Sequence, residues 1–206
     1  LNPILQDPAL AIHPPLLYLG FVGSSIYFSA ALASLISKFT GKDFALVTRP
    51  WILISWLFQT LGILVGSIWA YYELGWGGYW FWDPVENSSL IPWFLMTALL
   101  HSILVLERRN GIYLWVVILS ILTFTMSVTG TFLVRSGILN SVHTFASDPT
   151  RGLYILIFLS VMIFSSIYIF YRYANKEEAK FEMFSKEFFI LMNNWFMSFF
   201  LITVLI

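Results

Sequence analysis

Five long apolar runs constrain the fold of this 206-residue chain more than any other feature. They cover residues 16–37, 51–72, 89–106, 112–134 and 153–171, and a sixth run begins near Phe188. A helix needs roughly 20 apolar residues to cross about 30 Å of hydrocarbon. A backbone in lipid must satisfy its own hydrogen bonds, and the alternation typical of a β-barrel strand is not visible. The runs therefore predict transmembrane helices.

Composition supports the same class of protein. Hydrophobic residues make up 59% of the chain and charged residues 11%, against roughly 45–50% and about 25% in soluble domains. This balance excludes an ordinary soluble enzyme, a disordered segment and a nucleic-acid binder with a basic face. We expect an all-α, polytopic transmembrane helical bundle with five complete spans and a truncated sixth. Because the chain starts with Leu1 and stops inside an apolar run, we expect a fragment of a longer protein.

The distribution of basic residues predicts the orientation of the spans. The loops after the first, third and fifth spans carry nine Lys and Arg residues, whereas the opposite side carries two, Arg135 and Arg151. Basic loops stay on the cytoplasmic or matrix side. The N-terminal segment, loop 73–88 and loop 135–151 are therefore predicted to share the outer side.

Loop 73–88 is the most informative part of the sequence. It contains the string WGGYWFWDPVEN, from Trp76 to Asn87, and Trp93 follows shortly after. Interfacial Trp and Tyr are normal in membrane proteins, so an aromatic belt is one interpretation. Glycine lets the backbone approach a flat object, so a platform for a large planar ligand is the other. Asp83 fits a helix N-cap, with proline next and Glu86 at the third helical position.

The chain has three histidines and no cysteine. His13 and His143 lie on the predicted outer side, with the aromatic loop, and could bind a haem iron from its two faces. His101 lies inside the third span, where an ionisable side chain is a functional candidate, although a packed histidine is the plainer alternative. The spacing of the histidines and the absence of cysteine disfavour zinc, and the chain lacks a nucleotide-binding glycine loop.

These residues carry a resemblance to a known family. The Trp-rich string resembles the WWD signature of haem-handling membrane proteins. Its flanks resemble the CcmF/NrfE branch, the haem lyase subunit of system I cytochrome c maturation. The supporting strings are LQDP at 5–8, HPPLLY at 13–18, GTFLVRSG at 130–137 and SVHTFASDP at 141–149.

The resemblance implies a single transmembrane haem-handling domain over 1–206, with 73–93 as the haem-binding WWD segment. It implies that His13 and His143 ligate an outer-face substrate haem. It also implies that His101 ligates a membrane haem b whose second ligand lies outside the fragment. The expected cofactor-binding set is His13, His101, His143, Trp76, Gly77, Gly78, Trp80, Trp82, Asp83, Trp93 and Arg135. Arg135 or Arg151 could pair with haem propionates, and snorkelling at a helix end is an equal alternative.

The resemblance further implies a subunit that acts in a complex and attaches haem covalently to apocytochrome c. The expected partners are a haem chaperone, an apocytochrome with a Cys-x-x-Cys-His segment, thioredox and apocytochrome-presenting subunits, and membrane lipid, without nucleic acid. The expected location is the bacterial inner membrane with the WWD loop facing the periplasm, or the mitochondrial inner membrane. The alternatives are a haem exporter or other transporter with an aromatic mouth, and an electron-carrying cytochrome b.

Overall fold

The computed structural model describes residues 6–75, 77–139, 141, 148–174, 188–189 and 192–193. Over these residues it contains five long helices, in line with the five predicted spans. Each is long and apolar enough to cross a membrane. They are α1 (Pro8–Ser37), α2 (Gly41–Glu73), α3 (Pro84–Arg109), α4 (Tyr113–Ser136) and α5 (Pro149–Tyr173). The sixth predicted span and the charged connector before it lie almost entirely outside the described residues.

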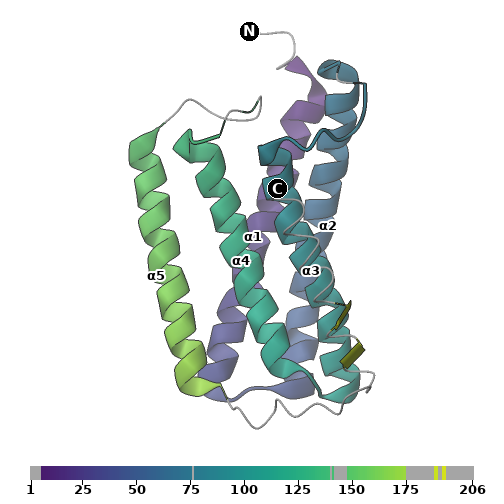
Figure 1. Ribbon diagram of the computed structural model, residues 1–206. Helices are drawn as coiled ribbons and strands as arrows, with labels where there is room; N and C mark the ends of the chain where they lie inside the picture. The colour runs from purple at the N-terminus through teal and green to yellow at the C-terminus, as the bar shows by residue number, and fades with distance from the viewer. Residues whose placement is uncertain are drawn as a thin grey trace.

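The first four helices form an up-and-down bundle in which each packs against its neighbours in the ring, α1 against α2, α2 against α3, α3 against α4 and α4 against α1. α5 packs on the outside of this bundle, against α4 and α1 (Figure 1). One fully buried cluster, which includes Tyr27, Phe44, Leu99 and Val116, fills the centre. Residues 38–40 join α1 to α2 and residues 110–112 join α3 to α4, and such short connections are typical of antiparallel neighbours in a helix bundle.

Two helices, α1 and α2, begin well before their predicted apolar runs. α1 begins at Pro8 and continues through Pro14 and Pro15, because Asp7 caps its first turn and α2 supports it along one side. α2 begins at Gly41, so Arg49 lies in a helix rather than in the predicted loop. Its Nη1 donates to Glu107 Oε2 of α3 at 2.6 Å. Hydropathy detects only the part of a helix that lies in hydrocarbon, and α2 extends beyond it.

Helices α1, α3 and α5 start at the same end of the bundle, which the sequence predicts to face outward and which we call the outer end. All three begin with the same kind of cap. Asp7, Asp83 and Asp148 are N-caps, and each is followed by a proline at the first helical position. A carboxylate at this position accepts hydrogen bonds from backbone N–H groups that have no partner within the helix. The predicted cap at Asp83 is confirmed. These starts, together with the ends of α2 and α4, form the outer end of the bundle (Figure 1).

Candidate haem site at the outer end

The Trp-rich loop between α2 and α3 is held by the first turn of α3. Asp83 and Glu86 form a capping box, and Glu86 Oε2 accepts from the backbone N–H groups of Phe81 at 3.1 Å and Asp83 at 3.3 Å. Asn87 Nδ2 donates to Trp82 O at 3.2 Å. Trp82 takes a left-handed conformation with φ +59°, which is uncommon for a bulky residue. The loop therefore has a specific conformation rather than that of a loose connector.

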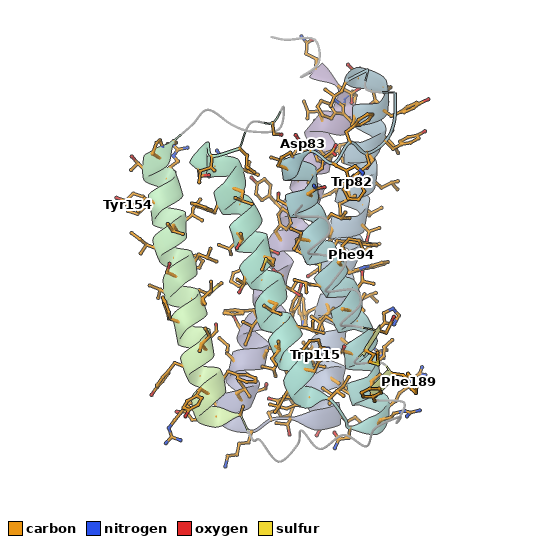
Figure 2. The ribbon with its side chains drawn as sticks, in the orientation of Figure 1. Trp82, Asp83, Phe94, Trp115, Tyr154 and Phe189 are labelled. Carbon is orange, nitrogen blue, oxygen red and sulfur yellow. The ribbon has the colours of Figure 1, made fainter. Side chains whose placement is uncertain are left out.

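The loop also contacts the end of α2. The rings of Tyr71 and Tyr79 stack with centroids 4.4 Å apart and an interplanar angle of 10°. The rings of Trp80 and Trp82 meet edge to face at 6.4 Å. This arrangement sends the two tryptophans in different directions. Trp80 lines a cavity inside the bundle, and 59% of the Trp82 surface is exposed. Figure 2 shows Trp82 and Asp83 where α3 begins, at the end of the bundle opposite Trp115.

A cavity of about 540 Å³ opens at this end, between α1, α2, α3 and α4. Its volume lies within the roughly 300–1,000 Å³ typical of small-molecule sites. Three predicted site residues line it, namely His13 from α1, Trp80 from the loop and Arg135 from α4. Most of the remaining wall is aliphatic or aromatic, with a few polar groups that include Glu86, Ser88 and Thr131. A largely apolar cavity lined by an imidazole and a guanidinium suits a largely apolar ligand that carries an acidic group.

His13 is oriented by the backbone of α2. Its Nδ1 lies 3.1 Å from Gly62 O. A carbonyl oxygen can only accept, so this contact places the proton on Nδ1 and the lone pair on Nε2. A hydrogen bond of this kind is the usual way in which a ligating imidazole is oriented.

Asp83 connects the Trp-rich loop to loop 135–151. Its Oδ2 accepts from the backbone N–H groups of Val85 at 3.0 Å and Glu86 at 3.4 Å. The same oxygen accepts from the Ser141 hydroxyl at 2.7 Å. Ser141 belongs to the loop that carries His143 in the sequence. His143 itself and Trp76 lie outside the described residues, so their predicted roles stay predictions.

The other predicted loop residues do not line the cavity. Gly77 and Gly78 lie in the loop, and Gly77 has a left-handed φ of +80°. Trp93 packs between α2 and α3 in a reciprocal pair with Trp56, with ring centroids 6.3 Å apart. Trp93 Nε1 donates to Thr60 Oγ1 at 2.8 Å, and Trp56 Nε1 donates to Thr97 Oγ1 at 2.9 Å. In this structure Trp93 thus joins two helices below the cavity.

His101 lies on the exposed side of α3, eight residues before this helix ends at Arg109. At 1.5 Å per residue this is about 12 Å from that end of the helix. The residue is exposed in the described part of the chain. Among the described residues His101 is therefore not a packed histidine of the bundle core, which was the plainer alternative.

The two outer arginines differ in their surroundings. Arg151 Nε pairs with Asp148 Oδ2 at 3.1 Å on the exposed start of α5. Arg135 lines the cavity. Of the two alternatives left by the sequence, this geometry favours Arg135 for a contact with an acidic group of a ligand in the cavity.

The cavity also includes residues that the predicted set omits. Trp69 is 4% exposed, and Gly66 and Glu86 share the cavity wall. The spacing of Gly62 and Gly66, a Gly-x-x-x-Gly pattern in an apolar run, is the signal that could have identified a close helix contact here. No local pattern distinguishes Trp69 from the other interfacial tryptophans.

Comparison with known proteins assigns the chain to a family. Residues 1–139 match the family model described as cytochrome C assembly protein. The chain belongs to the cytochrome c assembly protein family. The resemblance to the CcmF/NrfE branch is confirmed by relatives of both kinds.

Several bacterial relatives are similar over 94% of this chain. The cytochrome c-type biogenesis protein CycK of Bradyrhizobium diazoefficiens is 56% identical over 196 residues. CcmF of Escherichia coli is 52% identical over 196 residues, and NrfE of Haemophilus influenzae is 48% identical over 197. The chain spans about 30% of the length of these relatives.

One solved structure shares the fold. It is the protein named cytochrome c heme lyase CcmF, with a TM-score of 0.78 and 34% sequence identity. The match covers 97% of this chain and 30% of that one. The five helices thus form a multi-pass membrane segment of a cytochrome c assembly protein.

Proposed function

We propose that this segment holds haem at the outer face of the membrane while the haem is attached covalently to apocytochrome c. The observation that carries the proposal is the cavity in which His13, Trp80 and Arg135 meet. The His13 imidazole would bind the haem iron through Nε2, because Nδ1 faces Gly62 O. His143 would supply the second axial ligand from the neighbouring loop.

The cavity wall supports this assignment. Its aliphatic and aromatic side chains would pack on the faces of the porphyrin, with Trp80 among them. Arg135 would pair with a haem propionate, since guanidinium groups bind carboxylates strongly in apolar surroundings. The exposed ring of Trp82 and residues Gly77 and Gly78 would border the haem where it emerges toward its partner. Trp76 would belong to the same border.

The reaction that this site would serve is addition of a cysteine thiol to a haem vinyl group. The sulfur forms a bond to one vinyl carbon, the proton of the thiol goes to the other, and the double bond becomes single. Two such additions attach the haem to a Cys-x-x-Cys-His segment without net oxidation. The task of this chain is positioning, because holding two reactants in place is worth several orders of magnitude in effective concentration.

His101 would hold a second, membrane haem of the b type together with a ligand outside this chain. The exposed position of His101 on α3 fits such a shared site. A haem bound there would supply an electron that keeps the iron of the outer haem reduced.

The partners follow from the same proposal. A haem chaperone would deliver haem to the outer face, which in a bacterial inner membrane is the periplasmic side. Apocytochrome c would be presented there with reduced thiols by other subunits of the maturation system. The absence of cysteine from this chain fits a division of roles in which the thiols and their reductants belong to the partners.

Haem spectra of the purified full-length protein test the ligand assignment. His13→Ala and His143→Ala are each expected to remove the low-spin signal of the outer haem and to stop cytochrome c formation. His101→Ala is expected to remove only the absorbance of the membrane haem. Variants at 13 and 143 with an unchanged outer haem and normal cytochrome c output would contradict the proposal.

Reconstitution with an apocytochrome peptide separates the proposed lyase from the alternatives. Thioether formation in proteoliposomes, with haem supplied on the outer side, is the expected result. Haem appearing on the outer side without attachment would indicate an exporter. Reduction of the haem iron without attachment would indicate an electron-carrying cytochrome b.

A further inference from the structure

The contact between α1 and α2 forms a regular antiparallel seam that runs from the outer end into the membrane. Glycines recur along it, as in many close helix pairs in membranes. The pairs, from the outer end inward, are Asp7 with Tyr72, His13 with Gly66, Leu17 with Gly62, Gly20 with Gln59 and Gly23 with Ser55. At the outermost pair, the Tyr72 hydroxyl donates to Asp7 Oδ1 at 2.7 Å.

His13 occupies a niche in this seam that only glycine leaves open. A Cβ on Gly66 would stand 2.7 Å from His13 Nδ1 and 2.9 Å from Cε1. Both distances are below any ordinary van der Waals contact. The imidazole therefore lies directly against the backbone of α2, where its Nδ1 reaches Gly62 O at 3.1 Å.

The niche has a chemical consequence as well as a steric one. Gly62 O lies within α2, where it accepts the helical hydrogen bond, and its second lone pair is directed to His13. This contact selects the Nδ1–H tautomer and makes Nε2 the basic nitrogen. Losing such an orienting partner typically costs about 10–100-fold in affinity at metal sites.

The position of Gly66 separates this role from simple helix packing. Gly66 and His13 both line the cavity, whereas Gly20 and Gly23 do not. Gly20 and Gly23 bring α1 close to Gln59 and Ser55 deeper in the bundle. The seam thus has several close contacts, and the outermost glycine contact involves the imidazole.

We propose that Gly66 and the carbonyl of Gly62 are positioning elements for the axial ligand His13. They set the distance of the imidazole from α2, its tautomer and the direction of Nε2 toward the cavity. The proposal rests on the proposed function, because it assumes that His13 ligates the outer haem. It adds that α2, which supplies no iron ligand itself, determines how well His13 of α1 binds the iron.

Gly66→Ala in the full-length, haem-loaded protein is the direct test. The added methyl group is expected to push the ring away from Gly62 O and to lower outer-haem affinity about 10–100-fold. The low-spin spectrum should be lost, and exogenous imidazole should restore it. Gly23→Ala is the matched control, because it crowds the same two helices about 15 Å further along α1 and should keep the spectrum.

The outcomes distinguish the two levels of the proposal. If His13→Ala leaves the spectrum unchanged, the proposed ligand is wrong. If His13→Ala removes the low-spin signal and Gly66→Ala retains it, the positioning role is wrong. Equal spectral losses in Gly66→Ala and Gly23→Ala, without rescue by imidazole, would also overturn the positioning role and indicate packing alone.

A double variant keeps the test decisive if Gly66→Ala does not accumulate. The clash is with the His13 ring, so His13→Ala combined with Gly66→Ala should accumulate as well as His13→Ala alone. Loss of the double variant would show that Gly66 is required for folding independently of the imidazole, and would overturn the proposal.

Discussion

The hydrogen bond between Ser141 and Asp83 should make loop 135–151 and the start of α3 open together, as a single cooperative unit. Ser141→Ala removes one hydrogen bond to a charged acceptor, a class worth about 1.5–3 kcal/mol. Because both side chains are only half-buried, we expect the lower end, about 1.5 kcal/mol. Asp83→Ala removes the same bond and the N-cap, which adds about 1 kcal/mol.

Hydrogen–deuterium exchange of the full-length protein measures these losses locally, as the free energy of opening. In the peptides that cover 78–89, Ser141→Ala should speed exchange about tenfold and Asp83→Ala about 60-fold, since about 1.4 kcal/mol corresponds to a factor of ten. The double variant should match Asp83→Ala, because the shared bond can be lost only once.

Asp148→Ala is the matched control. This residue also caps a helix before a proline, but among the described residues its side chain contacts Arg151 of its own helix, α5. It should speed exchange about fivefold at the start of α5, from the loss of about 1 kcal/mol, and leave 78–89 unchanged. If the double variant at 83 and 141 exchanges ten times faster than Asp83→Ala, the two residues act independently and the reasoning is refuted.

Three further predictions concern the contacts that hold the bundle together, each measured as unfolding free energy in mixed detergent micelles. Thr60→Val should cost about 1 kcal/mol, because Trp93 Nε1 loses its acceptor, and Thr60→Ser should retain it; equal costs for both variants would refute this. Arg49→Gln should lower the free energy of unfolding by at most about 1 kcal/mol, since the pair with Glu107 is partly exposed. Exchanging the two charges, with Arg49→Glu and Glu107→Arg together, should recover part of the stability that each reversal loses alone. A double variant as unstable as the two single reversals combined would refute the pairing. Gly41→Ala should cost about 1 kcal/mol or more, because φ is +70° at this position; an unchanged stability would count against it.

The sequence predicted the fold because its signals are local. Apolar runs report which segments can lie in hydrocarbon, and the excess of basic residues on one side reports orientation. Asp83 could be identified as a cap because its partners lie two and three residues along the chain. The family was recognisable from short strings for the same reason.

The candidate site was predicted in part. His13, Trp80 and Arg135 were chosen because they share the outer face, and the structure brings them to one cavity. Trp93 was chosen by proximity to the Trp-rich string, yet it packs between α2 and α3. Trp80 lies on the loop and Trp93 on α3, so the two face different surroundings, and their proximity in the sequence carries no information about that.

The sequence alone was enough to locate the five helices that the described residues form as candidate membrane spans, the loops that share a side, the start of α3 and the family. Helix packing, in contrast, selects the tryptophan that faces the cavity and the arginine that shares it with His13, and it brings the imidazole against Gly62 and Gly66. The physical reason is the range of the interactions. Hydropathy, helix caps and charge act within a few residues, whereas the niche for His13 exists only where two helices meet 49 positions apart in the chain.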